Sequence, residues 1–169
     1  LNPNFVYSCS PVATGMVVAF EGYRDEEYNV PKALFERRGA RVVTIADRMG
    51  TATGKLGAMT VVDRLLRDAL ADEFDAVVFV GGPGSKGYFD SGECHELART
   101  ALAQGKVVAA ICSAGGILAK AGVLRGKKAT CYVGMADDLK NAGAIYQDAP
   151  VVVDGNLITS PHYRDNGVF

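Results

Sequence analysis

The feature that most constrains the fold is an apolar run that ends abruptly at a cysteine, within residues Val107 to Leu118. The run VVAAI precedes Cys112, and small residues from Ser113 to Gly116 follow it before a helical pattern begins. This order predicts a buried strand, a tight turn that carries the thiol, and a helix whose N-terminus points at it. Because the positive end of a helix dipole favours negative charge, we expect this thiol to be more acidic than a free one. We therefore predict that Cys112 is a nucleophile.

Strands and helices are predicted to alternate along the rest of the chain. Strands are expected at 16–20, 41–45, 76–80 and 107–111, helices at 26–38, 93–104, 113–121 and 136–141, a polar loop at 47–57, and a hairpin with an Asp-Gly turn at 151–159. Strands that are apolar throughout are typical of a mostly parallel sheet with helices on both faces. The predicted fold class is therefore α/β, and we expect the site at the carboxyl ends of the strands.

The chain has 169 residues, the size of one domain, and we divide it into an N-terminal extension (1–15) and a single domain (16–169). Its formal net charge is −1 and its charges are interspersed, which argues against a nucleic-acid partner. No apolar stretch approaches the ~20 residues that cross a bilayer, so no membrane association is expected. The four cysteines form no C-x-x-C pair and no signal-peptide pattern opens the chain, which fits a reducing cytoplasm.

A glycine-rich turn follows the predicted strand at 76–80. Residues 82–87 (GPGSKG) match the G-x-G-x-x-G pattern of dinucleotide-binding loops, but the next strand ends in Cys112 where an acidic residue would hold a ribose. We therefore expect no cofactor, and the spacing of histidines and cysteines predicts no metal site. Two interpretations of Gly81 and Gly82 stay open, a turn that needs positive φ or a close approach of the backbone to the reacting group. In the second case, the Gly82 and Ser113 amides would both donate to a developing oxyanion.

Cys112 also has a second interpretation, because buried cysteines are often small core residues. Ala110 and Ala114 are the small neighbours that a nucleophile elbow requires, and they favour a reactive thiol. Glu27, near the start of the first predicted helix, is placed to face the same strand ends and to exchange protons with the thiol. His162, in a loop after the last strand, is the other candidate for proton transfer.

Several segments together resemble the ThiJ/PfpI superfamily, relatives of the human parkinsonism-associated deglycase and of archaeal intracellular proteases. The resemblance spans residues 16–160 and is carried by FEG at 20–22 with Glu27 and Pro31, DAVVFVGG at 75–82, AIC at 110–112, AGVLRGKKAT at 121–130 and VVDGNLITS at 152–160. It implies a flavodoxin-like three-layer sandwich with a nucleophile elbow, usually assembled as a homodimer. It also implies that Cys112 is the nucleophile, that Glu27 is a protonated glutamate beside it, and that the Gly82 and Ser113 amides form an oxyanion hole.

The chain departs from the family pattern at three positions. Ser113 stands where the protease-like branch has a histidine, Lys86 where that branch has a glutamate from a neighbouring subunit, and Cys131 where the deglycase-like branch has a histidine. A histidine base is thus missing from both expected positions, which leaves His162 or Glu27 to move protons. The family also usually ends in a further helix, and we expect that helix to be missing because the sequence ends before it.

We expect a cysteine-dependent enzyme that acts on reactive carbonyls. The reaction would be that of a cofactor-free glyoxalase or deglycase, converting a 2-oxoaldehyde such as methylglyoxal to a 2-hydroxy acid, with small carbonyls or glycated proteins as substrates. One alternative is amide hydrolysis by an intracellular cysteine peptidase, for which His162 is the base that the sequence offers. The other is a non-enzymatic redox sensor or chaperone in oxidative stress, in which Cys112 is oxidised and Glu27 stabilises the product.

Overall fold

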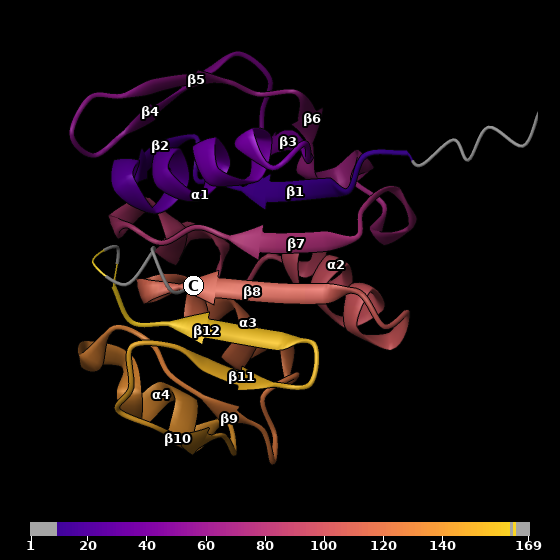
Figure 1. Ribbon diagram of the computed structural model, residues 1–169. Coiled ribbons are helices and arrows are strands. Elements are labelled where there is room, and N and C mark those ends of the chain that lie inside the picture. The colour runs from indigo at the N-terminus through magenta and orange to yellow at the C-terminus, as the bar shows by residue number, and fades with distance from the viewer. Residues whose placement is uncertain (1–9, 163, 165–169) are drawn as a thin grey trace, which may run out of the picture.

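A central seven-stranded sheet organises the protein, whose computed structural model describes residues 10–162 and 164 (Figure 1). The sheet is built from β1 (Ala13–Val17), β3 (Arg41–Ala46), β6 (Arg64–Leu65), β7 (Ala76–Phe79), β8 (Val107–Ile111), β11 (Val152–Asp154) and β12 (Leu157–Ser160). The strands lie in the order β11-β12-β8-β7-β1-β3-β6, and all neighbours are parallel except the β11–β12 hairpin. The predicted, mostly parallel α/β sheet is confirmed.

Helices cover both faces of this sheet. They are α1 (Asp25–Arg37), α2 (Gly92–Ala103), α3 (Gly115–Ala121) and α4 (Ala136–Asn141). Figure 1 shows α1 in front of the sheet, and α2 and α3 behind it. This is the expected flavodoxin-like sandwich of three layers. No helix among the described residues is both long and apolar enough to cross a membrane.

Alternating side chains of β1 supply the two halves of the core. Met16 is fully buried in the cluster that contains Tyr28 of α1, whereas Val17 is buried in the cluster that contains Leu97 of α2 and Ile117 of α3. Successive side chains of a strand point to opposite faces, so a strand covered on both faces is apolar at every position. That pattern is why the sheet strands were recognisable in the sequence.

Two small sheets stand beside the central one. One contains β2 (Glu21–Tyr23), β4 (Thr51–Gly54) and β5 (Met59–Val61), and the other pairs β9 (Lys128–Ala129) with β10 (Ile145–Tyr146). The prediction of a loop over 47–57 was wrong, because β4 lies within it. Its exposed and buried residues alternate, but its sequence TATG has too little apolar content to reveal a half-buried strand.

The first strand begins earlier than predicted. β1 starts at Ala13 instead of Met16, so residues 13–15 belong to the sheet and not to the proposed extension. Gly15 has a packing reason to lack a side chain, since a Cβ there would lie 2.9 Å from Ile45 Cδ1. The start of the strand was missed because residues 13–15 (ATG) have low hydrophobicity. Residues 1–9 of the proposed extension lie outside the described part of the chain, as does most of the segment after residue 162.

Pro31 lies inside the first helix, where proline is usually unfavourable. α1 begins at Asp25, so Pro31 is in its second turn and is buried. Proline has no N–H to donate to the carbonyl four residues earlier, which here belongs to Glu27. The helix therefore lacks one backbone hydrogen bond next to a residue that the sequence singles out for chemistry.

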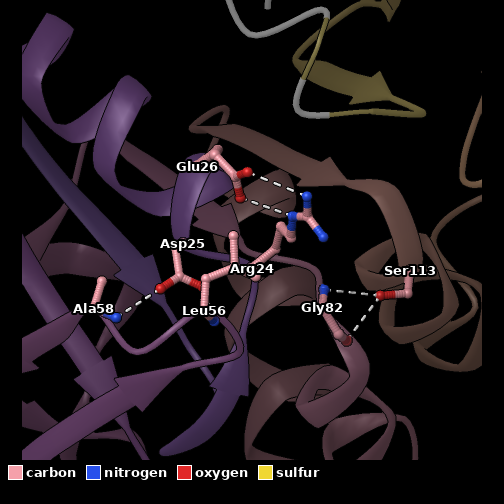
Figure 2. Close-up of polar contacts among 7 residues, drawn as sticks. All are labelled: Arg24, Asp25, Glu26, Leu56, Ala58, Gly82 and Ser113. Atoms are coloured by element: carbon pink, nitrogen blue, oxygen red, sulfur yellow. Dashed lines mark hydrogen bonds and ion pairs between the residues drawn. The ribbon is translucent and has the colours of Figure 1, made fainter.

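The Asp25 side chain holds the turn between β4 and β5. Its carboxylate is buried and accepts hydrogen bonds from the Leu56 and Ala58 amides, both at 2.8 Å (Figure 2). A Cβ on Gly54 would lie 2.4 Å from Asp25 Oδ1, so this position has room only for glycine. The turn is thereby fixed to the first residue of α1.

Replacing Asp25 with alanine tests this link. The Asp25→Ala variant leaves two amides without their charged acceptor, and we expect a loss of about 2–3 kcal/mol in the free energy of unfolding, measured in urea. Asp90→Ala is the matched control, because that side chain is exposed and makes only a 3.7 Å ion pair with Lys120. A change below about 0.5 kcal/mol in both variants would contradict the role of Asp25.

Candidate active site

Cys112 occupies a strained turn between β8 and α3. Its φ is 58°, and it is the one non-glycine residue with positive φ among the described residues. Such a conformation costs about 1–3 kcal/mol and persists only where the surroundings impose it. Here β8 ends at Ile111, and a short 3-10 turn (Cys112–Ala114) leads directly into the helix. The predicted elbow geometry is therefore present.

Three segments meet at Gly81, which follows β7. A Cβ at Gly81 would lie 2.5 Å from Glu27 Oε2, 2.6 Å from the Ile111 carbonyl and 2.9 Å from Cys112 Cβ. Any side chain there would push the carboxyl and the thiol apart. Gly82, in contrast, has a φ of 105°, and a Cβ on it would lie 2.4 Å from the Arg24 backbone nitrogen. Both interpretations of the Gly-Gly pair thus apply, since both glycines admit a close approach and the second also needs positive φ.

Glu27 is a buried carboxyl in contact with Cys112, the predicted nucleophile. It is only 1% exposed, and one of its oxygens, Oε2, has no hydrogen-bond partner among the described residues. Burial raises the pKa of Glu27 to about 7, while hydrogen bonds from the Cys112 thiol and the Gly81 amide and the charge of Arg24 oppose the rise. A carboxyl with this pKa exchanges protons near neutral pH.

The prediction that the Cys112 thiol is more acidic than a free thiol was wrong. Burial raises the pKa of Cys112 to about 11, and the charge of Glu27 adds to the rise, while hydrogen bonds from Ser113 oppose it. The α3 N-terminus was expected to dominate, but desolvation and a neighbouring carboxylate outweigh it. Near neutral pH the Cys112 thiol therefore keeps its proton, while the Glu27 carboxyl is partly protonated.

The two proposed oxyanion donors are linked to each other (Figure 2). The Gly82 amide donates to Ser113 Oγ at 3.1 Å, and the Ser113 hydroxyl donates back to the Gly82 carbonyl at 3.0 Å. Ser85 Oγ lies 2.8 Å from the same Ser113 oxygen. The Ser113 backbone amide instead donates to the Cys112 sulfur. An oxyanion that uses the Gly82 amide would have to take the place of the Ser113 hydroxyl.

One cavity of about 430 Å³ collects all five residues proposed from the sequence. Cys112, Glu27, Gly82, Ser113 and His162 all line it. The His162 ring also stands edge-on to the ring of Tyr132, with centroids 6.5 Å apart. The loop after β12 thus brings a histidine into the cavity from the far end of the chain.

The cavity also contains residues that the sequence alone did not assign to a site. They are Arg24, Lys55, Pro83, Tyr132, Gly134 and Met135, together with Lys86, which was noted only as a departure from the family. Lys55 and Tyr132 lie in segments with no recognisable motif. Neither lies next to a strand end that the sequence predicts, so no signal in the sequence pointed to them.

The other cysteines and the second histidine lie in different surroundings. Cys94 and Cys131 are buried free thiols, and burial raises the pKa of each to about 12. His95 Nε2 donates to the Phe89 carbonyl at 2.7 Å, which gives it a structural contact away from the cavity. No group of three metal-ligating side chains occurs among the described residues. Cys9 lies outside them.

Comparison with known proteins places these features in a family. The family model described as "DJ-1/PfpI family" matches residues 14–169. Deglycase PfpI of Pyrococcus furiosus is 38% identical over 143 residues, which cover 85% of this chain and 86% of that protein. A putative cysteine protease of Bacillus subtilis, YraA, is 35% identical over 145 residues, covering 85% and 86% of the two chains.

The structural comparison agrees with the sequence matches. The crystal structure of a ThiJ/PfpI domain protein from Brachyspira murdochii superposes with a TM-score of 0.91 at 34% identity, covering 94% of this chain and 92% of that one. Relatives named as a deglycase and as a cysteine protease therefore share this fold over most of their length. Sequence, fold and family model lead to one conclusion: the chain belongs to the DJ-1/PfpI family.

Proposed function

We propose that this protein is a cofactor-free enzyme of the glyoxalase or deglycase type that acts on 2-oxoaldehydes through Cys112. The observation that carries the proposal is the contact between the buried Glu27 carboxyl and the Cys112 thiol inside a cavity. A thiol adds readily to an aldehyde, and a carboxyl with a pKa near 7 can accept and return the protons that such chemistry requires.

The first step is addition of sulfur to the aldehyde carbon. Glu27, as a carboxylate, accepts the thiol proton while the Cys112 sulfur forms a bond to the carbonyl carbon. The carbonyl electron pair moves to oxygen, which takes that proton back from Glu27 to give a hemithioacetal and restores the carboxylate. The Ser113 amide, which faces the sulfur, and the Gly82 amide, once released by the Ser113 hydroxyl, are the proposed donors to that oxygen.

The second step moves hydrogen between the two carbons of the substrate. Glu27 removes the hydrogen of the former aldehyde carbon as a proton, while the neighbouring carbonyl oxygen takes up a proton, which gives an enediol. Glu27 then returns its proton to the neighbouring carbon, while the hydroxyl on the sulfur-bearing carbon loses its proton and becomes a carbonyl. The product is a 2-hydroxyacyl thioester on Cys112. Water then hydrolyses the thioester, which releases the 2-hydroxy acid and restores the thiol. Overall, the 2-oxoaldehyde and one water give the 2-hydroxy acid, and no external oxidant or reductant is needed. His162 lines the same cavity and is a second candidate to activate the water.

Relatives named as deglycases support this class of substrate, and glycated proteins carry the adducts of the same aldehydes. The peptidase alternative draws support from the relative named as a putative cysteine protease and from the presence of His162 in the cavity. Peptide hydrolysis needs a base that also protonates an amine leaving group. Glu27 serves carbonyl chemistry more directly, because it already contacts the thiol. The three described cysteines are free thiols, which supports a reducing, cytoplasmic location.

Replacing the nucleophile tests the proposal directly. We expect Cys112→Ser to lower kcat/KM for methylglyoxal by about a thousandfold or more, measured as D- or L-lactate formed. Cys94→Ala is the matched control, because that thiol is buried away from the cavity and its loss leaves the site intact. Unchanged turnover in Cys112→Ser would overturn the proposal. Absence of turnover in the native protein, with gain of two oxygens at Cys112 after mild peroxide, would favour the redox-sensor alternative.

The variant Glu27→Gln tests the role of the carboxyl in catalysis and its effect on the stability of the fold. We expect kcat/KM to rise with pH near 7 in the native protein, and in Glu27→Gln to lose that rise and fall by about 10²–10⁴-fold. Because the folded pKa lies above that of the unfolded chain, the carboxyl stabilises the fold most at low pH, and this stability is lost as the pH rises through about 7.

The same variant therefore makes a prediction about stability. The shift from 4.5 to about 7 corresponds to about 3 kcal/mol, so Glu27→Gln should be more stable than the native protein by roughly that amount at pH 9, relative to their difference at pH 4. Urea unfolding at the two pH values measures it. An equal pH dependence in both proteins would contradict the buried, titrating carboxyl.

A homodimer is the assembly that we propose. Leu56, Met59 and Val61, at and beside β5, are each more than 60% exposed, and a surface of this kind is uncommon on a monomer. We expect sedimentation equilibrium to give the mass of two chains, and the double variant Met59→Glu/Val61→Glu to give the mass of one. Val153→Glu, at an exposed position on β11, is the control. A native protein that stays monomeric would exclude the dimer.

A further inference from the structure

Two lysines at the active-site cavity have no carboxylate partner among the residues that the structure describes. Lys55 and Lys86 both line the cavity that holds Cys112, and neither forms an ion pair with any described residue. The third cation of the cavity, Arg24, is paired with Glu26, with Nε 2.7 Å from one carboxylate oxygen (Figure 2). The charge of Arg24 is thus offset, whereas no described carboxylate offsets the charges of the two lysines.

The backbone beneath Lys55 is fixed in place. The Lys55 amide donates to the Tyr23 carbonyl at 2.8 Å, and the next amide, that of Leu56, donates to the buried Asp25 carboxylate. Gly54 on the other side cannot carry a side chain because of that carboxylate. The turn therefore presents Lys55 at the cavity without freedom to move its backbone away.

The backbone beneath Lys86 is tied to the elbow itself. The 3-10 helix Pro83–Tyr88 begins directly after Gly82, and the neighbouring Ser85 is buried. Ser85 Oγ donates to the Gly82 carbonyl at 2.8 Å and contacts the Ser113 hydroxyl. Ser85, the residue before Lys86, is thus hydrogen-bonded to Ser113, the residue that follows Cys112.

The charge balance of the cavity is positive. Its described lining contains Arg24, Lys55 and Lys86, but Glu27 is the one carboxyl in that set, and burial keeps it partly protonated near pH 7. Lys55 and Lys86 are exposed to solvent, and a cleft lined by charges of one sign attracts ions of the opposite sign. The volume of about 430 Å³ also exceeds what a carbonyl as small as methylglyoxal fills.

We propose that the substrate carries an anionic group, a carboxylate or a phosphate, that binds between Lys55 and Lys86 while its aldehyde lies at Cys112. This inference rests on the proposed function and extends it by naming the class of 2-oxoaldehyde. The anionic group takes no part in bond changes, so the reaction keeps the balance given above. Acidic 2-oxoaldehydes such as 4,5-dioxopentanoate belong to this class, and a phosphate ester of a 2-oxoaldehyde is its phosphate counterpart.

Alkylation of Cys112 tests the anion site without any aldehyde. Iodoacetate and iodoacetamide both place a carbon on the sulfur and release iodide, but only iodoacetate is charged. We expect the ratio of their rate constants at Cys112, followed by peptide mass, to exceed that of free cysteine by about three- to tenfold at low salt. The ratio should fall to the free-cysteine value in Lys55→Gln/Lys86→Gln and in high salt. Lys106→Gln/Lys120→Gln, which removes two charges away from the cavity, should keep the native ratio.

Turnover then tests the substrate class. We expect kcat/KM for 4,5-dioxopentanoate to exceed that for its neutral methyl ester by about tenfold, and this preference to vanish in the double variant of Lys55 and Lys86. A phosphorylated 2-oxoaldehyde compared with its dephosphorylated form distinguishes phosphate from carboxylate as the preferred group. Equal rates for the charged and neutral forms, together with an iodoacetate ratio equal to that of free cysteine, would overturn the anion site and leave the glyoxalase proposal standing. No turnover of any aldehyde, with the iodoacetate preference intact, would overturn the glyoxalase proposal instead.

Discussion

The close approach at Gly81 is the constraint on which the site depends. A carboxyl from α1, the carbonyl at the end of β8 and Cβ of Cys112 all come within contact distance of the position where a side chain of residue 81 would stand. The absence of that side chain lets Glu27 reach the nucleophile. The strained φ of Cys112 serves the same end, because it turns the thiol out of the strand and toward the carboxyl. The parallel sheet matters for function mainly because it aligns these strand ends.

Much of this arrangement could be predicted from local sequence. β7 and β8 are apolar at nearly every position, and a cysteine between small residues at a strand-to-helix corner is typical of a nucleophile elbow. β4 and the start of β1 were missed, because TATG and ATG carry little hydrophobic signal and become strands through their neighbours. Glycine at 15 and at 54 is required by side chains from distant parts of the chain, Ile45 and Asp25, which no local pattern reveals.

The electrostatics of the site were the least predictable part. The helix N-terminus after Cys112 is visible in the sequence, and it favours an acidic thiol. Desolvation depends on everything packed around the group, and the charge of Glu27 depends on a contact between residues far apart in the chain. These two effects raise the pKa of Cys112 by more than the helix dipole lowers it. The sequence likewise suggested that the Gly82 amide is free to bind an oxyanion. In the structure this amide donates a hydrogen bond to the Ser113 side chain. The sequence showed Ser113 only as a serine in place of the family's histidine.

Ser113 and the pKa of Glu27 both bear on which group accepts the proton of the Cys112 thiol. No histidine directly follows Cys112 in the chain, and the Cys112 thiol hydrogen-bonds to Glu27. The pKa values of about 7 and about 11 suggest an uphill transfer, but part of the higher value comes from the negative charge of Glu27 itself. That repulsion disappears when Glu27 takes the proton, and the new carboxylic acid can donate a hydrogen bond to the thiolate. Attack by sulfur and transfer of the proton therefore assist each other, which is how a buried thiol without a histidine can still react.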